Sequence, residues 1–306
     1  MAHMAPTQDR LDDGPAATDE TRQAGVPAAG EHQPPADDSA SSRRPSHRLR
    51  TIAMSILLPL IPIAAFVVIW HVLTDNQVVA WLRFNRMPTP GAVLESFIDR
   101  VNSGGYYADL FASLQRILLG FGLAAIVGIA LGMLIGRSEI ARKTLRPFIE
   151  MVRPIPAIAL VPLTILLFPS SEQGIVFITF FAAFFPVLVS TIHAMDSLPK
   201  VWEEAALTMG ASRWTILRSV VLPGAMPGIF AGLSVAMGVA WICVVSAEMI
   251  SGQFGIGYYT WQSYGLLDYA GVVVGMLSIG ALGLITAWIV ELIGRRINHW
   301  LPRASR

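Results

Sequence analysis

The sequence predicts an all-α membrane protein whose core is a six-helix transmembrane bundle. Two observations lead to this prediction. The chain of 306 residues is 54% hydrophobic and only 14% charged, whereas soluble domains carry about 25% charged residues. Apolar runs also recur from residue 54 onward, and most are close to the roughly 20 residues that an α-helix needs to cross a bilayer.

The first 50 residues differ in composition from the rest of the chain. They are dense in Ala, Pro, Asp, Ser and Gly and contain almost no large apolar residues. Such a segment cannot bury enough apolar surface to offset the entropy of ordering it. We therefore expect a disordered tail over residues 1–50, followed by a transmembrane domain over residues 51–300.

Six apolar runs are candidates for membrane-spanning helices. The third run is the weakest, because Pro154, Pro156 and Pro162 interrupt it. Neighbouring helices can satisfy the carbonyl groups that a proline leaves free, so we expect a kinked span there. The runs lie near residues 54–73, 112–136, 148–168, 174–195, 224–249 and 271–293.

Lys and Arg are distributed unevenly over the segments that connect these runs. One alternating set of segments holds only Arg83, Arg86 and Arg100. Cytoplasmic segments are enriched in Lys and Arg, so we expect a multi-pass protein of the cytoplasmic (cell) membrane with both termini in the cytoplasm. The basic set holds Arg43, Arg44, Arg48, Arg50, Arg137, Arg142, Lys143, Arg146, Lys200, Arg213, Arg218, Arg295, Arg296, Arg303 and Arg306.

The external segment after the first run contains one amphipathic helix, over about residues 89–102. Thr89 can act as its N-cap with Pro90 at the first helical position, and the polar stretch 102–105 ends it. On the same side, aromatic residues gather between 258 and 269. We expect these rings at the membrane–water interface.

Two runs carry a small residue at every fourth position. Membrane helices associate through close van der Waals packing, which small residues permit. We therefore expect a close helix crossing along each stripe. The two stripes are Gly120, Ala124, Gly128, Gly132 and Gly136, and Gly224, Gly228, Gly232, Ala236 and Ala240.

The cytoplasmic segment over about residues 199–223 predicts two short helices joined by a break, which we call the elbow. Glu203 and Glu204 lie near the start of the first helix, where acids are favoured. Gly210 fits a left-handed C-cap, and Ser212 can cap the second helix. We expect that second helix to end before Pro223. Such an elbow can dock into a groove on a soluble partner.

The elbow resembles the EAA loop of permeases from binding-protein-dependent ABC importers. Three features carry the resemblance, at the spacing of that loop: Glu204-Ala205-Ala206, then Gly210, then Val220-x-Leu222-Pro223. A lone Glu-Ala-Ala would carry no weight. The complete spacing in a loop between the fourth and fifth runs does.

Other stretches narrow the resemblance to permeases of the nitrate/sulfonate/taurine/bicarbonate type, over about residues 55–298. One departure is Phe168-Pro169-Ser170-Ser171, where these permeases often have a Phe-Gly pair closing the third span. The matching stretches are Ser113-Leu114-x-Arg116-x-Leu118-x-Gly120-Phe121, Arg153-Pro154-Ile155-Pro156-x-x-Ala159-x-x-Pro162-Leu163, Phe184-Phe185-Pro186-Val187, and Ala247-Glu248-Met249 followed by Gly255-Ile256-Gly257-Tyr258.

The resemblance implies a type I ABC importer permease fold and a set of partners. Two permease copies, expected as a homodimer, would each insert an elbow into a cleft on one of two copies of an ATPase subunit. Glu204 would anchor the elbow, Gly210 would permit its bend and Trp214 would pack into the cleft. The implied ATPase-coupling residues are Glu204, Ala205, Ala206, Gly210, Trp214, Leu222 and Pro223.

The chain itself is not expected to be an enzyme or to bind a cofactor directly. It has no Gly-x-x-x-x-Gly-Lys-Ser/Thr phosphate loop, so ATP and Mg would bind to the partner ATPase. No catalytic constellation or metal-ligand cluster stands out in the sequence. An extracytoplasmic solute-binding protein would deliver the solute, membrane lipid would surround the spans, and no nucleic acid is expected.

Ionisable residues inside membrane spans point to function. Arg116 and Glu248 fall at a similar depth near the outer ends of the second and fifth runs. We expect them to pair and hold an outer gate; the alternative is that Arg116 attracts an anion on the solute path. Ser190, Thr191 and Ser246 are weak candidates for a polar cavity, because single hydroxyls in membrane helices usually bond their own backbone.

The sequence thus favours the permease subunit of an ABC importer for a small anionic or zwitterionic solute of the nitrate, sulfonate, taurine or bicarbonate class. The main alternative is an ion-coupled secondary transporter or channel. Against it, the sequence shows neither an inverted repeat nor a chain of acids at mid-membrane. Two further alternatives are an intramembrane enzyme and a scaffold whose elbow only recruits a partner.

Overall fold

The computed structural model describes residues 46–79, 81 and 83–300, without the side chains of 46–57 and 59. The predicted disordered tail therefore lies outside the described residues, except for 46–50, which already belong to helix α1 (Ser46–Asp75). Residues up to Ile56 and residues from Leu57 onward form two separate units. The second unit holds the rest of α1 and all of the later helices.

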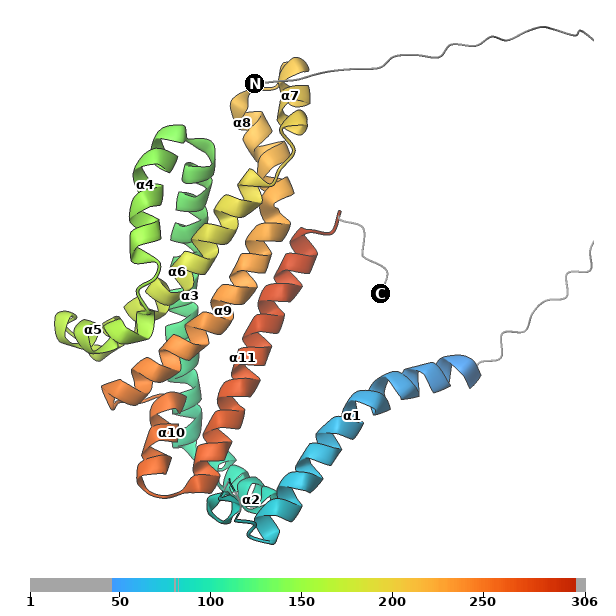
Figure 1. The fold of residues 1–306 in the computed structure, drawn as a ribbon, viewed down its shortest axis with the longest axis vertical. Coiled ribbons are helices and arrows are strands. Elements are labelled where there is room, and N and C mark those ends of the chain that lie inside the picture. Colours follow the sequence, from blue (N-terminus) through green and yellow to red (C-terminus); the bar gives the residue numbers. More distant parts are fainter. Residues whose placement is uncertain (1–45, 80, 82, 301–306) are drawn as a thin grey trace, which may run out of the picture. The chain divides into compact units, whose positions relative to one another are not determined.

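The second unit is helical in its described part, and its long helices α3, α6, α9 and α11 run side by side in Figure 1. Helix α1 contains the first predicted run, and the four long apolar helices correspond to the second, fourth, fifth and sixth runs. These four are α3 (Gly104–Arg137), α6 (Ser171–Asp196), α9 (Leu222–Ser251) and α11 (Tyr269–Ile297). The shorter elements are η1 (Phe84–Arg86), α2 (Pro90–Val101), α4 (Glu139–Val152), η2 (Ala157–Leu160), α5 (Val161–Leu167), α7 (Lys200–Thr208), α8 (Arg213–Ile216), the π-helical turn η3 (Leu217–Val221) and α10 (Ile256–Gly265).

The third predicted run, near 148–168, falls on two helical parts with a sharp break between them, and the first part begins earlier, at Glu139. The chain forms α4 and then, after a break, η2 and α5, and the two parts are bent by 77° relative to each other. The break contains Pro154 and Pro156, which cannot donate the backbone hydrogen bonds of a continuing helix. Four described helices meet the criteria for a span, or five if this bent pair counts as one.

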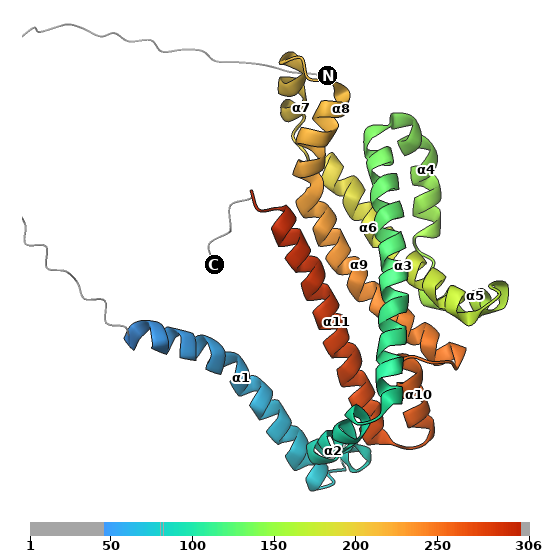
Figure 2. The ribbon, with the colours of Figure 1, turned by 180° about the vertical axis from the view of Figure 1, so that it is seen from behind.

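Helix α6 lies between α3 and α9 and packs closely against both (Figures 1 and 2). Both small-residue stripes face it. A Cβ atom added at Gly132 of α3 would stand 2.6 Å from the Cβ of Thr191, and one at Gly228 of α9 would stand 2.6 Å from the Cβ of Ala194. Both distances are shorter than a normal contact between carbon atoms. The backbones of α3 and α9 can therefore approach α6 this closely only because glycine has no side chain. The structure confirms both stripes as packing faces.

At one end of the bundle, α2 and α10 lie beside the first turns of α3 and α11 (Figure 2). The Thr89 hydroxyl accepts a hydrogen bond from the Ala92 amide (3.3 Å) and so caps α2. Residues 256–265 form α10, although we predicted only an aromatic segment there. The Tyr259 side chain is 7% exposed, with Arg100 5.2 Å above its ring. Tyr259 is therefore a core residue, whereas Trp261 on the same helix is exposed.

Replacing Gly132 by Ala is expected to lower the free energy of unfolding by about 1–3 kcal/mol, because the new methyl group would overlap Thr191. Gly122→Ala on the same helix is the matched control, since nothing lies within 4 Å of its added Cβ. That control is expected to be neutral or stabilising by up to about 1 kcal/mol. Unfolding in detergent measures both, and equal effects would contradict the packing role of the stripe.

Candidate functional site

The elbow has the predicted two-helix form. Helix α7 ends at Thr208, and Gly210 follows its C-cap residue with a left-handed φ of +81°, a conformation that glycine adopts without steric cost. The Gly210 amide donates to the carbonyl of Leu207 (2.9 Å) and the Ala211 amide to that of Ala206 (3.0 Å). The Ser212 hydroxyl accepts from the Thr215 amide (3.2 Å) and caps α8. The bend is therefore fixed by backbone geometry and by a cap.

The expectation that the second elbow helix ends before Pro223 is wrong. Helix α8 continues through the π-helical turn Leu217–Val221 into α9, so that Arg213–Ser251 is one continuous span. A π-helical turn inserts an extra residue into the helix. Pro223 then falls in the first turn of α9, where a missing amide donor is tolerated. The elbow is thus joined rigidly to the span that follows it.

The surface of the elbow is exposed and apolar. Glu204, Ala205 and Gly210 are exposed, and Trp214 is 70% exposed. Ala206 is buried, so this member of the motif faces inward. Exposed apolar patches commonly mark sites for a protein partner. Other exposed apolar side chains of the elbow are Val201, Trp202, Leu207 and Met209; Leu222 and Pro223 are half-buried at the start of α9.

Two ion pairs tie the elbow end of the bundle together. Arg137, at the end of α3, donates from Nη1 to both carboxylate oxygens of Glu203 on α7 (2.7 and 2.9 Å). Arg142 on α4 donates to Asp196, the last residue of α6 (2.6 Å), and to the carbonyl of Gly136 (3.2 Å). We did not predict these pairs, because the partners are far apart in sequence and only the fold brings them together.

At the opposite end, Arg116 on α3 is the centre of a buried ion cluster. Arg116 is 2% exposed and Glu248 on α9 is fully buried. The Arg116 Nη1 atom donates to Glu248 Oε1 (2.8 Å) and to the carbonyl of Phe254 (2.5 Å). Its Nε atom donates to Glu172 Oε2 (2.7 Å), and Nη2 pairs with the other oxygen of Glu172. The expected contact of Arg116 with Glu248 is present, together with a second acid.

The Glu248 carboxylate is held on further sides by hydroxyl and amide groups. The Ser113 hydroxyl lies 2.7 and 2.9 Å from its two oxygens, and the Gly257 amide donates to Oε2 (2.9 Å). Gly255 has a φ of +129°, and a Cβ there would stand 2.4 Å from the carboxylate carbon. The glycines after Glu248 are therefore required by the close approach of the chain to this carboxylate.

The cluster favours the structural pair over the alternative in which Arg116 attracts an anion. Its guanidinium already faces two carboxyl groups, so an anion would have to displace Glu172 or Glu248 to reach it. Glu172 was missed by the sequence analysis. It stands in the first turn of α6, where acids are common at helix N-termini, and no sequence signal connects it with Arg116.

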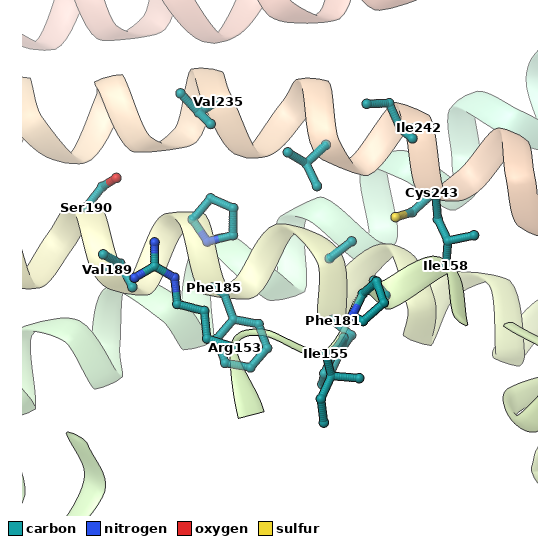
Figure 3. A pocket seen from close by; sticks show the side chains of 15 residues that line it. Arg153, Ile155, Ile158, Phe181, Phe185, Val189, Ser190, Val235, Ile242 and Cys243 are labelled. Carbon is teal, nitrogen blue, oxygen red and sulfur yellow. The ribbon is translucent and has the colours of Figure 1, made fainter. Parts of the chain in front are cut away.

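The three candidate hydroxyls differ in the structure. Thr191 is fully buried and donates to the carbonyl of Val187 (2.8 Å), and Ser246 donates to that of Ile242 (2.8 Å). Both therefore bond their own helix, and neither lines either of two cavities beside α6. Ser190 lines one of them, a cavity of about 490 Å³ between the α4–η2 break, α6 and α9 (Figure 3). The other, of about 790 Å³, lies between α3 and α6 beside Arg116 and Glu172.

The described residues hold no group of three or more His, Cys, Asp or Glu side chains that could bind a metal ion. The two clusters of charge described above consist of ion pairs. One ties α3 to α6 and α9, and the other ties α3 and α4 to α6 and the elbow.

Comparison with known proteins decides the family. Residues 125–299, which include the elbow and its flanking spans, match the model of the binding-protein-dependent transport system inner membrane component. The chain belongs to this family. It is therefore a permease subunit of an ABC importer, which is a membrane component of the transporter and not an enzyme.

Relatives and a solved structure agree with this assignment. The permease is 32% identical over 255 residues to the bicarbonate transport system permease protein of Synechococcus elongatus, covering 79% of this chain and 91% of that protein. It is 29% identical over 239 residues to the nitrate import permease protein of Synechocystis, covering 75% and 85%. The inward-facing methionine ABC transporter MetNI has the same fold, with a TM-score of 0.51 and 21% identity, over 64% of this chain and 96% of that one.

Removing Arg116 is expected to destabilise the permease by about 3–5 kcal/mol, because it leaves the fully buried Glu248 carboxylate without its cation. Glu172→Gln should cost much less, since the Glu172 side chain is 53% exposed. Unfolding in detergent measures Arg116→Ala, Glu172→Gln, Glu248→Ala and the double variant Arg116→Ala/Glu248→Ala. Additive losses in the double variant would contradict a paired cluster.

Proposed function

We propose that this permease forms the translocation path for a small anionic or zwitterionic solute and couples to a separate ATPase through its elbow. The observation that carries the coupling proposal is the exposed apolar elbow, fixed by a left-handed Gly210 and tied to α3 by the Arg137–Glu203 pair. The bicarbonate and nitrate permeases among its relatives support the solute class.

In this proposal the ATPase holds the elbow in a cleft, and ATP and Mg bind to the ATPase alone. Glu204 and Trp214 project from the elbow and supply one charged and one aromatic contact. Because α8 continues into α9, a displacement of the elbow becomes a displacement of a complete span. The coupling residues are then Glu204, Ala205, Ala206, Gly210 and Trp214, with Leu222 and Pro223 as the rigid connection to α9.

The proposed assembly contains two permease copies, two ATPase subunits and an extracytoplasmic solute-binding protein. Apolar side chains such as Ile126 and Leu284 are 70% and 72% exposed on the spans, so they require cover by lipid or by a second copy. A homodimer gives each ATPase copy one elbow. Both termini are placed in the cytoplasm, because the elbow end of the bundle carries the basic residues of the connecting segments.

The Arg116 cluster is proposed as a latch for the outer gate. It lies at the end of the bundle opposite the elbow and joins α3, α6, α9 and the turn before α10. Glu172 is half-exposed, so its contact with Arg116 is the part of the cluster that water can reach. A local movement of the first turn of α6, where Glu172 stands, would separate this pair without parting the packed helices.

Glu204→Ala and Gly210→Pro are expected to abolish stimulation of the ATPase by the solute-loaded binding protein. Proline fixes φ near −65°, which is incompatible with the +81° at Gly210. Glu139→Ala is the matched control, since it removes an exposed carboxylate from the same end of the bundle. The measurement is ATPase turnover of the co-purified complex in liposomes. Unchanged stimulation in both elbow variants, or transport by the permease without any ATPase, would refute the coupling proposal.

The Arg137–Glu203 pair is expected to transmit elbow movement to α3. Arg137→Glu or Glu203→Arg alone should lower coupled transport several-fold with little effect on stability, because a partly exposed pair contributes only about 0.2–1 kcal/mol. The double variant Arg137→Glu/Glu203→Arg restores opposite charges and should recover transport. Solute uptake per ATP hydrolysed is the measurement. Failure of the double variant to recover would show that the pair is not the link.

A further inference from the structure

The cavity of about 490 Å³ has a position that singles it out within the bundle. It is bordered by the break between α4 and η2, by residues Phe181 to Ser190 of α6 and by residues Val235 to Cys243 of α9 (Figure 3). These residues stand in the middle of helices of 26 and 30 residues. Transporters commonly place solute sites near the membrane midplane where a broken helix meets continuous ones.

Arg153 stands at the break and contributes to the lining of this cavity (Figure 3). Arg116, Arg137 and Arg142 each pair with a carboxylate. The Arg153 guanidinium makes no salt bridge or side-chain hydrogen bond with any residue that the structure describes. Arg153 is exposed, so its guanidinium is accessible to a solute. The cavity therefore offers a positive charge with no resident partner.

Ser190 adds one polar group to the same cavity. Its hydroxyl makes no hydrogen bond within the described part of the chain, unlike that of the neighbouring Thr191. In Figure 3, Ser190 and Arg153 lie toward the same end of the cavity. The other labelled side chains are apolar, among them Phe181, Phe185 and Ile242.

We propose that this cavity is an anion-binding station on the solute path, with Arg153 as the charged contact and Ser190 as a hydrogen-bond donor. One cation and one hydroxyl in an apolar wall suit a small oxyanion, such as a carboxylate, sulfonate or nitrate group. A sugar or a metal cation would need more polar groups or a carboxylate. Few contacts also suit a site that must release its solute, since conduction requires weak binding. This assignment rests on the proposed importer function and deepens it.

A structural role for Arg153 is the competing interpretation. Arg153 is the C-cap residue of α4, where a cation interacts favourably with the helix dipole. In that case its charge serves the helix, and the cavity has no preference for anions. The two interpretations differ in the electrostatic potential of the cavity and in its response to added anions.

The chain offers a direct probe of that potential, because it contains one cysteine. Cys243 lines the cavity but is only 3% exposed. In the variant Cys243→Ala/Ile242→Cys, the single thiol stands on the same wall at a position that is 58% exposed. The purified permease in detergent is labelled with the anionic 2-sulfonatoethyl and the cationic 2-(trimethylammonium)ethyl methanethiosulfonate. Both form a mixed disulfide and release methanesulfinate, so the ratio of the two rates reports the local potential.

Relative to 2-mercaptoethanol in the same detergent, this thiol is expected to favour the anionic reagent. Adding Arg153→Gln should lower the anionic-to-cationic rate ratio by about tenfold or more, and Arg153→Lys should preserve it. Arg146→Gln is the matched control, because it removes one arginine from the same helix outside the cavity. The melting temperature of each variant shows whether it is folded. A ratio that Arg153→Gln leaves unchanged overturns the proposal.

Binding itself is tested by protection. Sodium nitrate or sodium methanesulfonate should slow labelling more than sodium gluconate at equal ionic strength, and Arg153→Gln or Ser190→Ala should weaken this protection. Equal slowing by all three salts would show charge screening alone and would also overturn the proposal. Both measurements use the permease without its ATPase. If the elbow did not couple to an ATPase, the labelling rates and the protection would be unchanged. If the cavity did not bind anions, stimulation of the ATPase through the elbow would still be expected.

Discussion

The rest of the structure depends on the close approach of α3 and α9 to opposite sides of α6. In lipid, moving an apolar side chain from the lipid tails to a neighbouring helix gives no hydrophobic stabilisation. Helix association therefore depends on close van der Waals packing. The glycines of both stripes supply it, since a Cβ at Gly132 or Gly228 would overlap a side chain of α6. The three helices therefore form one tightly packed unit along most of their length.

This packing places charge at both ends of the same three helices. At one end Arg116 of α3 meets Glu172 of α6 and Glu248 of α9, and at the other Arg137 of α3 meets the elbow that leads into α9. Because the helices between these ends are tightly packed, they transmit a displacement rather than absorb it. An elbow bound to a moving partner and a latch at the far end are then mechanically connected without any further contact.

Patterns local in sequence were predictable, and contacts between distant segments were not. The stripes, the Thr89 and Ser212 caps and the left-handed Gly210 follow from spacing and residue type, and each is found in the structure. The contact of Arg116 with Glu248 followed from equal depth. The contact of Arg116 with Glu172 could not be predicted, because equal depth in the membrane does not determine which faces of two helices meet. The expected stop before Pro223 failed because a π-helical turn accommodated the proline.

The contrast between Arg116 and Arg153 shows why the surroundings of an arginine determine its role. Two carboxyl groups and a backbone carbonyl occupy the donors of Arg116, so a passing anion would have to displace these partners. Arg153 has no such partners among the described residues, and an open cavity lies beside it. From the sequence we expected Arg116 to pair with Glu248, and anion attraction at Arg116 was only the alternative. The helix break at Pro154 places Arg153 beside the cavity in the middle of α6 and α9. This position follows from the fold and could not be predicted from the sequence.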